Sequence, residues 1–231
     1  MRLFLEHKIH YCLVNEFIYP IVQIMNSLEA RLDWEVIAYL TKVEDMPEVK
    51  ALLNGSISKE DYTRFLKTFY IIEDISQRAV NIASDMTKND NPYLSKRFDV
   101  CAKGELGHAQ IALEDLEALG VVGVEINEGS IAQEYDNLLQ DCAREFPLGI
   151  LGHSYLFENA SGVMFPKHKP LEFPYKFVEV HAKEDPGHSI AIKKTIRHIE
   201  NDISPEDQTR MISFANKSGE YLLRVFDNIQ I

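Results

Sequence analysis

Three titratable side chains lie on one side of a helical stretch in the last quarter of the chain. In EVHAKEDPGHS (179–189), His181, Asp185 and His188 fall within about 60° of one another at 100° per residue. Apolar residues share this side, and burying the three groups without partners would cost several kcal/mol. One divalent metal would satisfy both imidazole and carboxylate, whereas the alternatives are a hydrogen-bonded His–Asp–His cluster or an exposed face without function. Pro186 frees a carbonyl oxygen, so we expect a helix bulge here.

Two earlier stretches carry acids or histidines of similar character. Glu105 and His108, in ELGHAQIALEDLEALG, have the Glu-x-x-His spacing that lets two side chains of one helix share a metal. The alternative is a surface Glu beside a hydrogen-bonded His. Glu73 lies in the middle of an apolar stripe, where a carboxylate needs a cation. That cation is either a metal or the side chain of Arg78 or Lys67.

A fourth stretch, PLGILGHSYLFENASGVMF, places Glu158 among small neighbours one turn away. Carboxylates and imidazoles that converge from several helices are how a bundle builds a di-iron or di-manganese centre. Thiolates are not part of the set, which argues against an iron–sulfur cluster. His153 and Cys142 lie off these stripes, and we predict that neither binds the metal. The predicted ligands are Glu73, Glu105, His108, Glu158, His181, Asp185 and His188.

Length and composition set the broad class. The 231 residues fit one domain spanning 1–231, and no linker divides them. The net charge of −12 argues against a nucleic-acid partner and against an anionic membrane surface. Three cysteines, Cys12, Cys101 and Cys142, form neither a disulfide framework nor a zinc motif, so we expect a cytoplasmic protein. No stretch approaches the roughly 20 apolar residues of a membrane span.

The elements that must position these side chains are helices, because apolar residues recur with a period of 3.6 throughout. We therefore predict an all-α fold. Ser58 and Ser204 are the expected N-caps of two of the helices. The apolar helix at the N-terminus offers a surface for a homodimer. The expected helices span 3–27, 29–43, 47–54, 59–87, 92–119, 130–145, 147–164, 174–201 and 205–228.

Several of these motifs resemble those of one superfamily. MPEVKALLNGSISKEDYTRFLKTFY (46–70) and ELGHAQIALEDLEALG are similar to segments of haem-oxygenase-like proteins of the TenA, pyrroloquinoline-quinone synthase and CADD type. The spacing His181-x-x-x-Asp185-x-x-His188 resembles the last metal-binding helix of the di-iron oxidases and oxygenases in that superfamily, which include CADD and UndA. Glu105 matches the Glu-x-x-His form of UndA-like members, whereas CADD-like members have a Glu where this chain has Cys101. The resemblance covers roughly residues 46–200.

The resemblance implies a single-domain haem-oxygenase-like helical bundle with two iron ions, or manganese, and O₂ as co-substrate. The expected activity is oxidation of a small organic substrate such as a fatty acid, an aromatic acid or an amino acid. One alternative is a metal-free TenA-like thiaminase, which needs a nucleophilic Cys beside a general base. Another is a CADD-like helical protein that binds a partner. Haem oxygenase itself needs a proximal His near the N-terminus, a position open to His7 or His10.

Overall fold

The computed structural model describes residues 27–122 and 130–228, and within these ranges the chain forms helices and no strand. The all-α prediction is confirmed. Seven of the expected helices are found with both ends within two residues of the predicted bounds. The helix expected at 3–27, and the dimer surface expected on it, lie outside the described residues.

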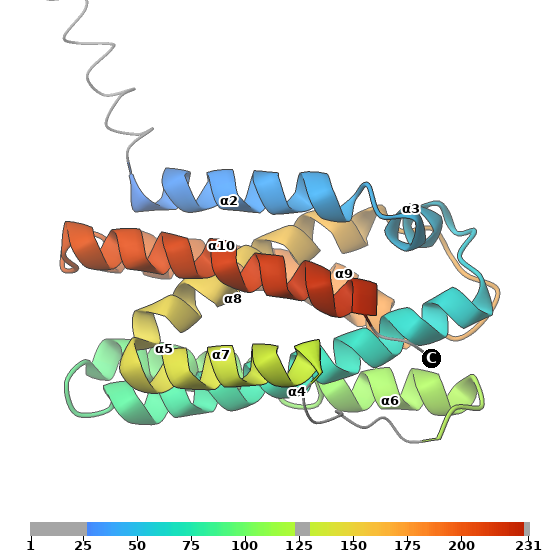
Figure 1. Ribbon diagram of the computed structural model, residues 1–231, viewed down its shortest axis with the longest axis horizontal. Helices are drawn as coiled ribbons and strands as arrows, with labels where there is room; N and C mark the ends of the chain where they lie inside the picture. Colours follow the sequence, from blue (N-terminus) through green and yellow to red (C-terminus); the bar gives the residue numbers. More distant parts are fainter. Residues whose placement is uncertain (1–26, 123–129, 229–231) are drawn as a thin grey trace, which may run out of the picture.

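The helices form two groups that pack against each other (Figure 1). In the first group, α4 contacts α5, α6 and α7, and in the second, α8 contacts α2, α9 and α10. Contacts of α6 with α9, α7 with α10 and α4 with α8 join the groups. The bounds are α2 Leu28–Val43, α3 Pro47–Asn54, α4 Lys59–Thr87, α5 Pro92–Gly104, α6 His108–Ala118, α7 Ile131–Glu145, α8 Pro147–Met164, the 3₁₀ turn η1 Phe165–Lys167, α9 Lys176–Ile199 and α10 Pro205–Asn228.

Helix α4 is the longest element and runs through the first group. It begins where the Ser58 hydroxyl accepts a hydrogen bond from the Asp61 N–H at 3.0 Å, which confirms the predicted N-cap. Tyr62, Leu66 and Phe69 lie on its buried face. That face also buries Glu73, one turn beyond Phe69, so the hydrophobic burial that stabilises the helix also carries a carboxylate into the interior.

The helix predicted at 92–119 is wrong in one respect, because the structure divides it into α5 and α6. The break spans Glu105 to Gly107, and Gly107 adopts a φ of +100°, a conformation that residues with a Cβ avoid. The two glycines of the GELGH segment, Gly104 and Gly107, explain the break. As a result, Glu105 caps the end of α5 and His108 is the first residue of α6.

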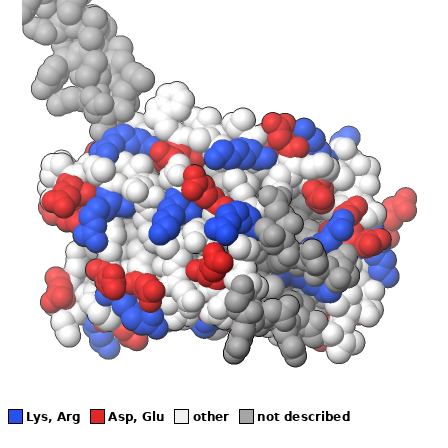
Figure 2. Space-filling model, in the orientation of Figure 1, with Lys and Arg blue, Asp and Glu red and all other residues white. Residues whose placement is uncertain are grey.

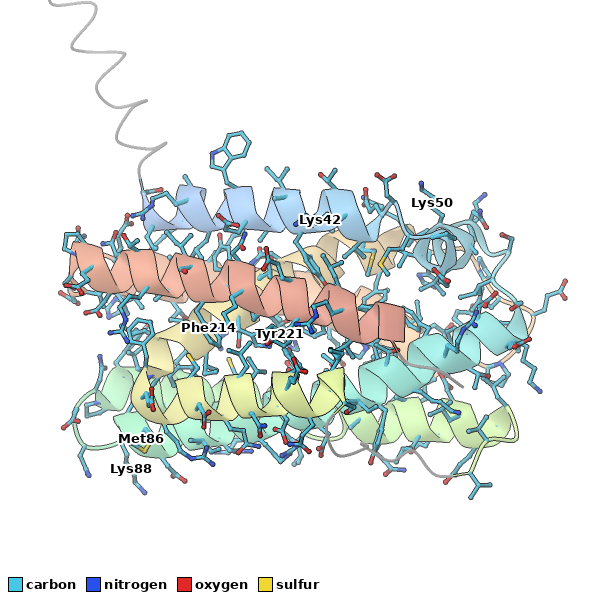
Figure 3. The ribbon with its side chains drawn as sticks, viewed as in Figure 1. Lys42, Lys50, Met86, Lys88, Phe214 and Tyr221 are labelled. Carbon is cyan, nitrogen blue, oxygen red and sulfur yellow. The ribbon has the colours of Figure 1, made fainter. Side chains whose placement is uncertain are left out.

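The outer surface carries charges of both signs. On the face in Figure 2, acidic and basic side chains are interspersed, and the described residues of this face show no stripe of one sign. Phe214 and Tyr221 of α10 lie between that helix and α7 (Figure 3), where both are partly buried against the core. Within the described ranges, every helix is too short or too polar to cross a membrane.

Candidate metal centre

Helix α9 contributes three of the predicted ligands. His181 and Asp185 are 3% and 2% exposed, and His188 lies at a partly exposed position one turn further on. The bulge expected at Pro186 is not observed, because α9 continues as an α-helix through it. Here α9 packs closely on α8, since a Cβ at Gly162 would lie only 3.1 Å from the Asp185 carbonyl oxygen.

One group of ligand atoms comes from three helices and is fully buried. Glu73 of α4, His108 of α6 and His181 of α9 form this first triad, whose ligand atoms all lie within 4.8 Å of one another. The His181 Nε2 atom is 3.5 Å from Glu73 Oε1, and the two imidazole rings are 4.6 Å apart. Arg78 pairs with Asp74 and Asp136 instead of Glu73, so it does not supply the cation that Glu73 needs.

A second group lies beside the first. Glu105 at the end of α5, Glu158 of α8 and His188 of α9 form this second triad, also with ligand atoms within 4.8 Å of one another. The His188 Nδ1 atom is 3.4 Å from Glu105 Oε1 and 3.3 Å from Glu158 Oε2. Asp185 approaches the same nitrogen at 3.9 Å. We refer to the two triads together with Asp185 as the ligand cluster.

Glu105 connects the triads through its two carboxylate oxygens. Oε1 faces His188, while Oε2 lies 2.7 Å from His108 Nδ1. A carboxylate whose two oxygens face two separate ligand groups has the arrangement of a bridging ligand in a dinuclear centre. The break between α5 and α6 makes this possible, because it places Glu105 and His108 on either side of a turn.

The atoms left without hydrogen bonds are the ones a metal would use. Among the described residues, six buried side-chain nitrogen or oxygen atoms have no hydrogen-bond partner, and five belong to the ligand cluster. The His108 Nδ1 contact with Glu105 is short but lacks hydrogen-bond geometry. Buried polar atoms without partners are rare and costly, and a metal would satisfy all five at once. They are Glu73 Oε1, His108 Nδ1, His181 Nε2, Asp185 Oδ2 and His188 Nδ1. The residues therefore fit a pair of divalent cations.

An outer hydrogen bond sets which nitrogen of His181 is free to bind a metal. His181 Nδ1 lies 2.7 Å from the Phe177 carbonyl oxygen, which can only accept, so Nδ1 carries the hydrogen and donates it. The Nε2 lone pair of neutral His181 then faces Glu73. His108 is arranged the opposite way: its Nδ1 faces the cluster, and its Nε2 lies 3.6 Å from the Glu184 carboxylate, which is too far for a hydrogen bond. An outer acceptor such as the Phe177 carbonyl oxygen orients a histidine ligand and raises its basicity.

In the absence of a cation, protons balance the clustered carboxylates. Burial and the negative charges of Glu105 and Asp185 raise the pKa of Glu158 well above its usual value. Burial also raises the pKa of Asp185 to about 6. Burial alone would lower the pKa of His181, but its contact with Glu73 outweighs this and raises it to about 9. A metal that binds here must displace protons.

His153 belongs to a separate polar cluster. Its Nε2 lies 3.2 Å from the Ser76 hydroxyl and 3.4 Å from that of Tyr135, and its Nδ1 lies 3.2 Å from the Ser218 hydroxyl. Burial lowers its pKa to about 4, so it is neutral. His153 is outside both triads, and its exclusion from the metal ligands stays a prediction.

Glu184 is near the site but was not among the predicted residues. This residue lies next to Asp185 on α9, and its side chain is half-exposed beside His108. The available signal was its position three residues after His181, which puts both side chains on neighbouring parts of one helical face. His168 and His198 lie away from the cluster, in contact with the Phe165 carbonyl oxygen and the Tyr93 ring respectively. His7, His10 and Cys12 lie outside the described residues.

Comparison with solved structures identifies the fold. No protein-family model and no curated protein matches this sequence. A TenA homologue from Pyrococcus furiosus superposes with a TM-score of 0.74 at 15% identity, over 87% of this chain and 98% of that one. A domain of unknown function with a haem-oxygenase-like fold from Shewanella denitrificans gives a TM-score of 0.69 at 18% identity, over 86% and 90%.

Haem oxygenase-1 from the cyanobacterium Synechocystis, solved in complex with haem, gives a TM-score of 0.64 at 16% identity, over 88% of this chain and 92% of that one. Identities this low establish the fold and leave the activity open. The fold expected from the sequence motifs is thereby confirmed: this chain has the all-α haem-oxygenase-like fold.

Proposed function

We propose that this protein is a non-haem oxidase or oxygenase that uses two iron ions, or manganese, to activate O₂ and oxidise a small organic substrate. The observation that carries the proposal is the pair of adjacent triads whose buried ligand atoms have no other partners. Imidazole and carboxylate are the ligand types that such metals take in helical bundles. When bound, the metals would supply the electrons that reduce O₂.

The protein residues would hold, space and shield these metals. Glu105 would bridge the two sites, because each of its oxygens faces a different triad. The apolar wall beside His181 is aromatic: the Phe177 and Phe165 rings lie 4.0 Å and 5.7 Å from the imidazole, and Phe69 packs against Phe177. This wall keeps water away from the first triad, which strengthens the electrostatic interactions within it.

A TenA-like hydrolase is the competing function, because TenA homologues share the fold. That chemistry needs a reactive thiolate. Burial raises the pKa of both Cys101 and Cys142 to about 12, so each described thiol is protonated at neutral pH. A hydrolase or a partner-binding protein would also leave the ligand cluster without a role. The geometry therefore favours the metal-dependent oxidase or oxygenase.

Oxygen consumption tests this proposal. Protein loaded anaerobically with ferrous iron should consume O₂ in an iron-dependent way when it is mixed with oxygenated buffer and a panel of fatty, aromatic and amino acids. His181→Ala should abolish this uptake. His198→Ala is the matched control, because His198 lies on the same helix with an exposed side chain. Equal uptake by wild type and His181→Ala across the panel would refute the proposal.

A further inference from the structure

Arg97 is an arginine without a partner. Its Nε atom is buried and has no acceptor, although the side chain as a whole is partly exposed, and the guanidinium makes no ion pair with any residue in the described part of the chain. Every other arginine in 27–122 and 130–228 has a side-chain partner: Arg31, Arg64, Arg78, Arg144, Arg197, Arg210 and Arg224. A buried donor on a permanent cation, left without an acceptor, indicates a site for an anion.

The position of Arg97 relates it to the metal centre. Helix α5 approaches α9 at two points: the Tyr93 ring lies 4.2 Å from that of His198, and a Cβ at Gly104 would lie 3.8 Å from His188 Nε2, so the two helices run in opposite directions. Arg97 lies between these two contacts along α5. It is two helical turns before Glu105, about 12 Å along the helix axis.

Cys101 lies between Arg97 and the ligand cluster. It is one turn from Arg97 on the same face of α5, and its thiol is mostly enclosed. Besides burial, the charges of Arg97, Glu158 and Glu105 act on the pKa of this thiol. A molecule bound by Arg97 and extending along α5 toward the ligand cluster would therefore pass the weakly polar Cys101 side chain.

We propose that Arg97 binds the carboxylate of the substrate. That substrate is a monocarboxylic acid with an apolar aliphatic or aryl-alkyl chain. The chain passes Cys101, so that the carbons farthest from the carboxylate lie at the ligand cluster. This rests on the proposed function, because it assigns the substrate of that site. The planar guanidinium matches a carboxylate with two parallel hydrogen bonds. The carboxylate is thus held away from the metals, so the oxidised carbon is remote from it.

Calorimetry on the metal-free protein tests the anchor without any metal. Octanoate and 4-phenylbutyrate should each bind at least tenfold more tightly than the matching primary amides. Arg97→Met should remove this preference and leave amide binding unchanged, whereas Arg97→Lys should retain part of it. Arg78→Met is the control, because Arg78 already has two carboxylate partners. Equal binding of acid and amide by wild type, a preserved preference in Arg97→Met, or no binding of either probe would overturn the proposal.

Proton relaxation with Mn²⁺-loaded protein tests the direction of the chain. The terminal methyl protons of bound octanoate should relax faster than the protons next to its carboxylate, because the methyl end lies nearer the metal. The reverse order would mean that the carboxylate lies at the metals and would overturn the anchor. Arg97→Met should keep the wild-type Mn²⁺ content; a marked fall would make Arg97 a counter-charge for the cluster instead. If neither Mn²⁺ nor ferrous iron binds but the calorimetric preference holds, the proposed function fails and the anchor stands.

Discussion

Replacing Asp185 with Asn should stabilise the metal-free protein while weakening metal binding. Burial, opposed in part by the charge of His181, raises the pKa of Asp185 from 3.8 to about 6. A carboxyl group whose pKa is higher in the folded state penalises folding once the pH exceeds its unfolded pKa. The difference between 3.8 and about 6 corresponds to about 3 kcal/mol at neutral pH, and the 2% exposure of this side chain means that solvent screens little of it.

The sign and the pH range follow from this linkage. Asp185→Asn removes the ionisation penalty, so the free energy of unfolding of the metal-free protein should rise by up to about 3 kcal/mol at pH 7.5. The gain should fall to about half at pH 5 and become small near pH 4, where the wild-type carboxyl is protonated when folded. With Mn²⁺ in excess the order should reverse, because bound metal stabilises the wild type by mass action.

Urea unfolding followed by circular dichroism measures these differences, after EDTA treatment and again with Mn²⁺. Asp90→Asn is the matched control, since it makes the same chemical change at an exposed position and should alter stability little. A metal-free Asp185→Asn protein that is less stable than wild type at pH 7.5 would refute the reasoning. So would a gain of the same size at pH 5 and pH 7.5.

Three further predictions concern the contact between α8 and α9, the protons that a metal displaces, and the reactivity of the cysteine thiols. Gly162→Ala should lower the free energy of unfolding by about 1–3 kcal/mol and weaken Mn²⁺ binding, because the added methyl group meets the α9 backbone at 3.1 Å. Gly187→Ala is the control in the same urea and Mn²⁺ titrations, because its added methyl group meets nothing within 4 Å, and it should keep both the stability and the Mn²⁺ affinity of the wild type. Equal losses of stability and affinity in the two variants would contradict this account. Although burial opposes it, the Glu73 contact raises the pKa of His181 to about 9, and burial raises the pKa of Glu158 as well. Mn²⁺ affinity should therefore rise at least tenfold per pH unit between pH 6.5 and 8.5, with proton release measurable by calorimetry in buffers of different ionisation enthalpy. A pH-independent affinity would contradict this. Burial raises the thiol pKa of Cys101 and Cys142 to about 12. Both thiols of the folded protein should therefore react with iodoacetamide at pH 7.5 roughly tenfold more slowly than in urea, which peptide mass spectrometry can measure. Fast alkylation of Cys142 in the folded protein would favour the hydrolase.

Local patterns in the sequence predict most of the fold. The starts of α4 and α10 could be predicted because Ser58 and Ser204 accept hydrogen bonds from the N–H groups three residues later. The break at Glu105–Gly107 was missed because apolar residues recur with helical period on both sides of it. The pattern outweighed the two nearby glycines in the prediction, whereas in the structure Gly107 takes a left-handed conformation.

The residues of the site could be predicted, but their grouping could not. Helical periodicity indicated that Glu73, His181 and His188 face inward, since each shares a stripe with buried apolar residues. Which carboxylate meets which imidazole depends on how the helices pack. Glu105 reaches both triads only because of the break, and Glu158 reaches His188 only because α8 and α9 approach closely at Gly162. Sequence spacing contains no information on either contact.

Metal stoichiometry tests the central claim most directly. After anaerobic loading with ferrous iron and removal of free metal, the wild type should retain two iron ions per chain by elemental analysis. His188→Ala should retain clearly less, because His188 Nδ1 is the imidazole atom of the second triad, while His198→Ala should match the wild type. A wild-type protein that retains no metal, or variants that retain as much as the wild type, would contradict the account.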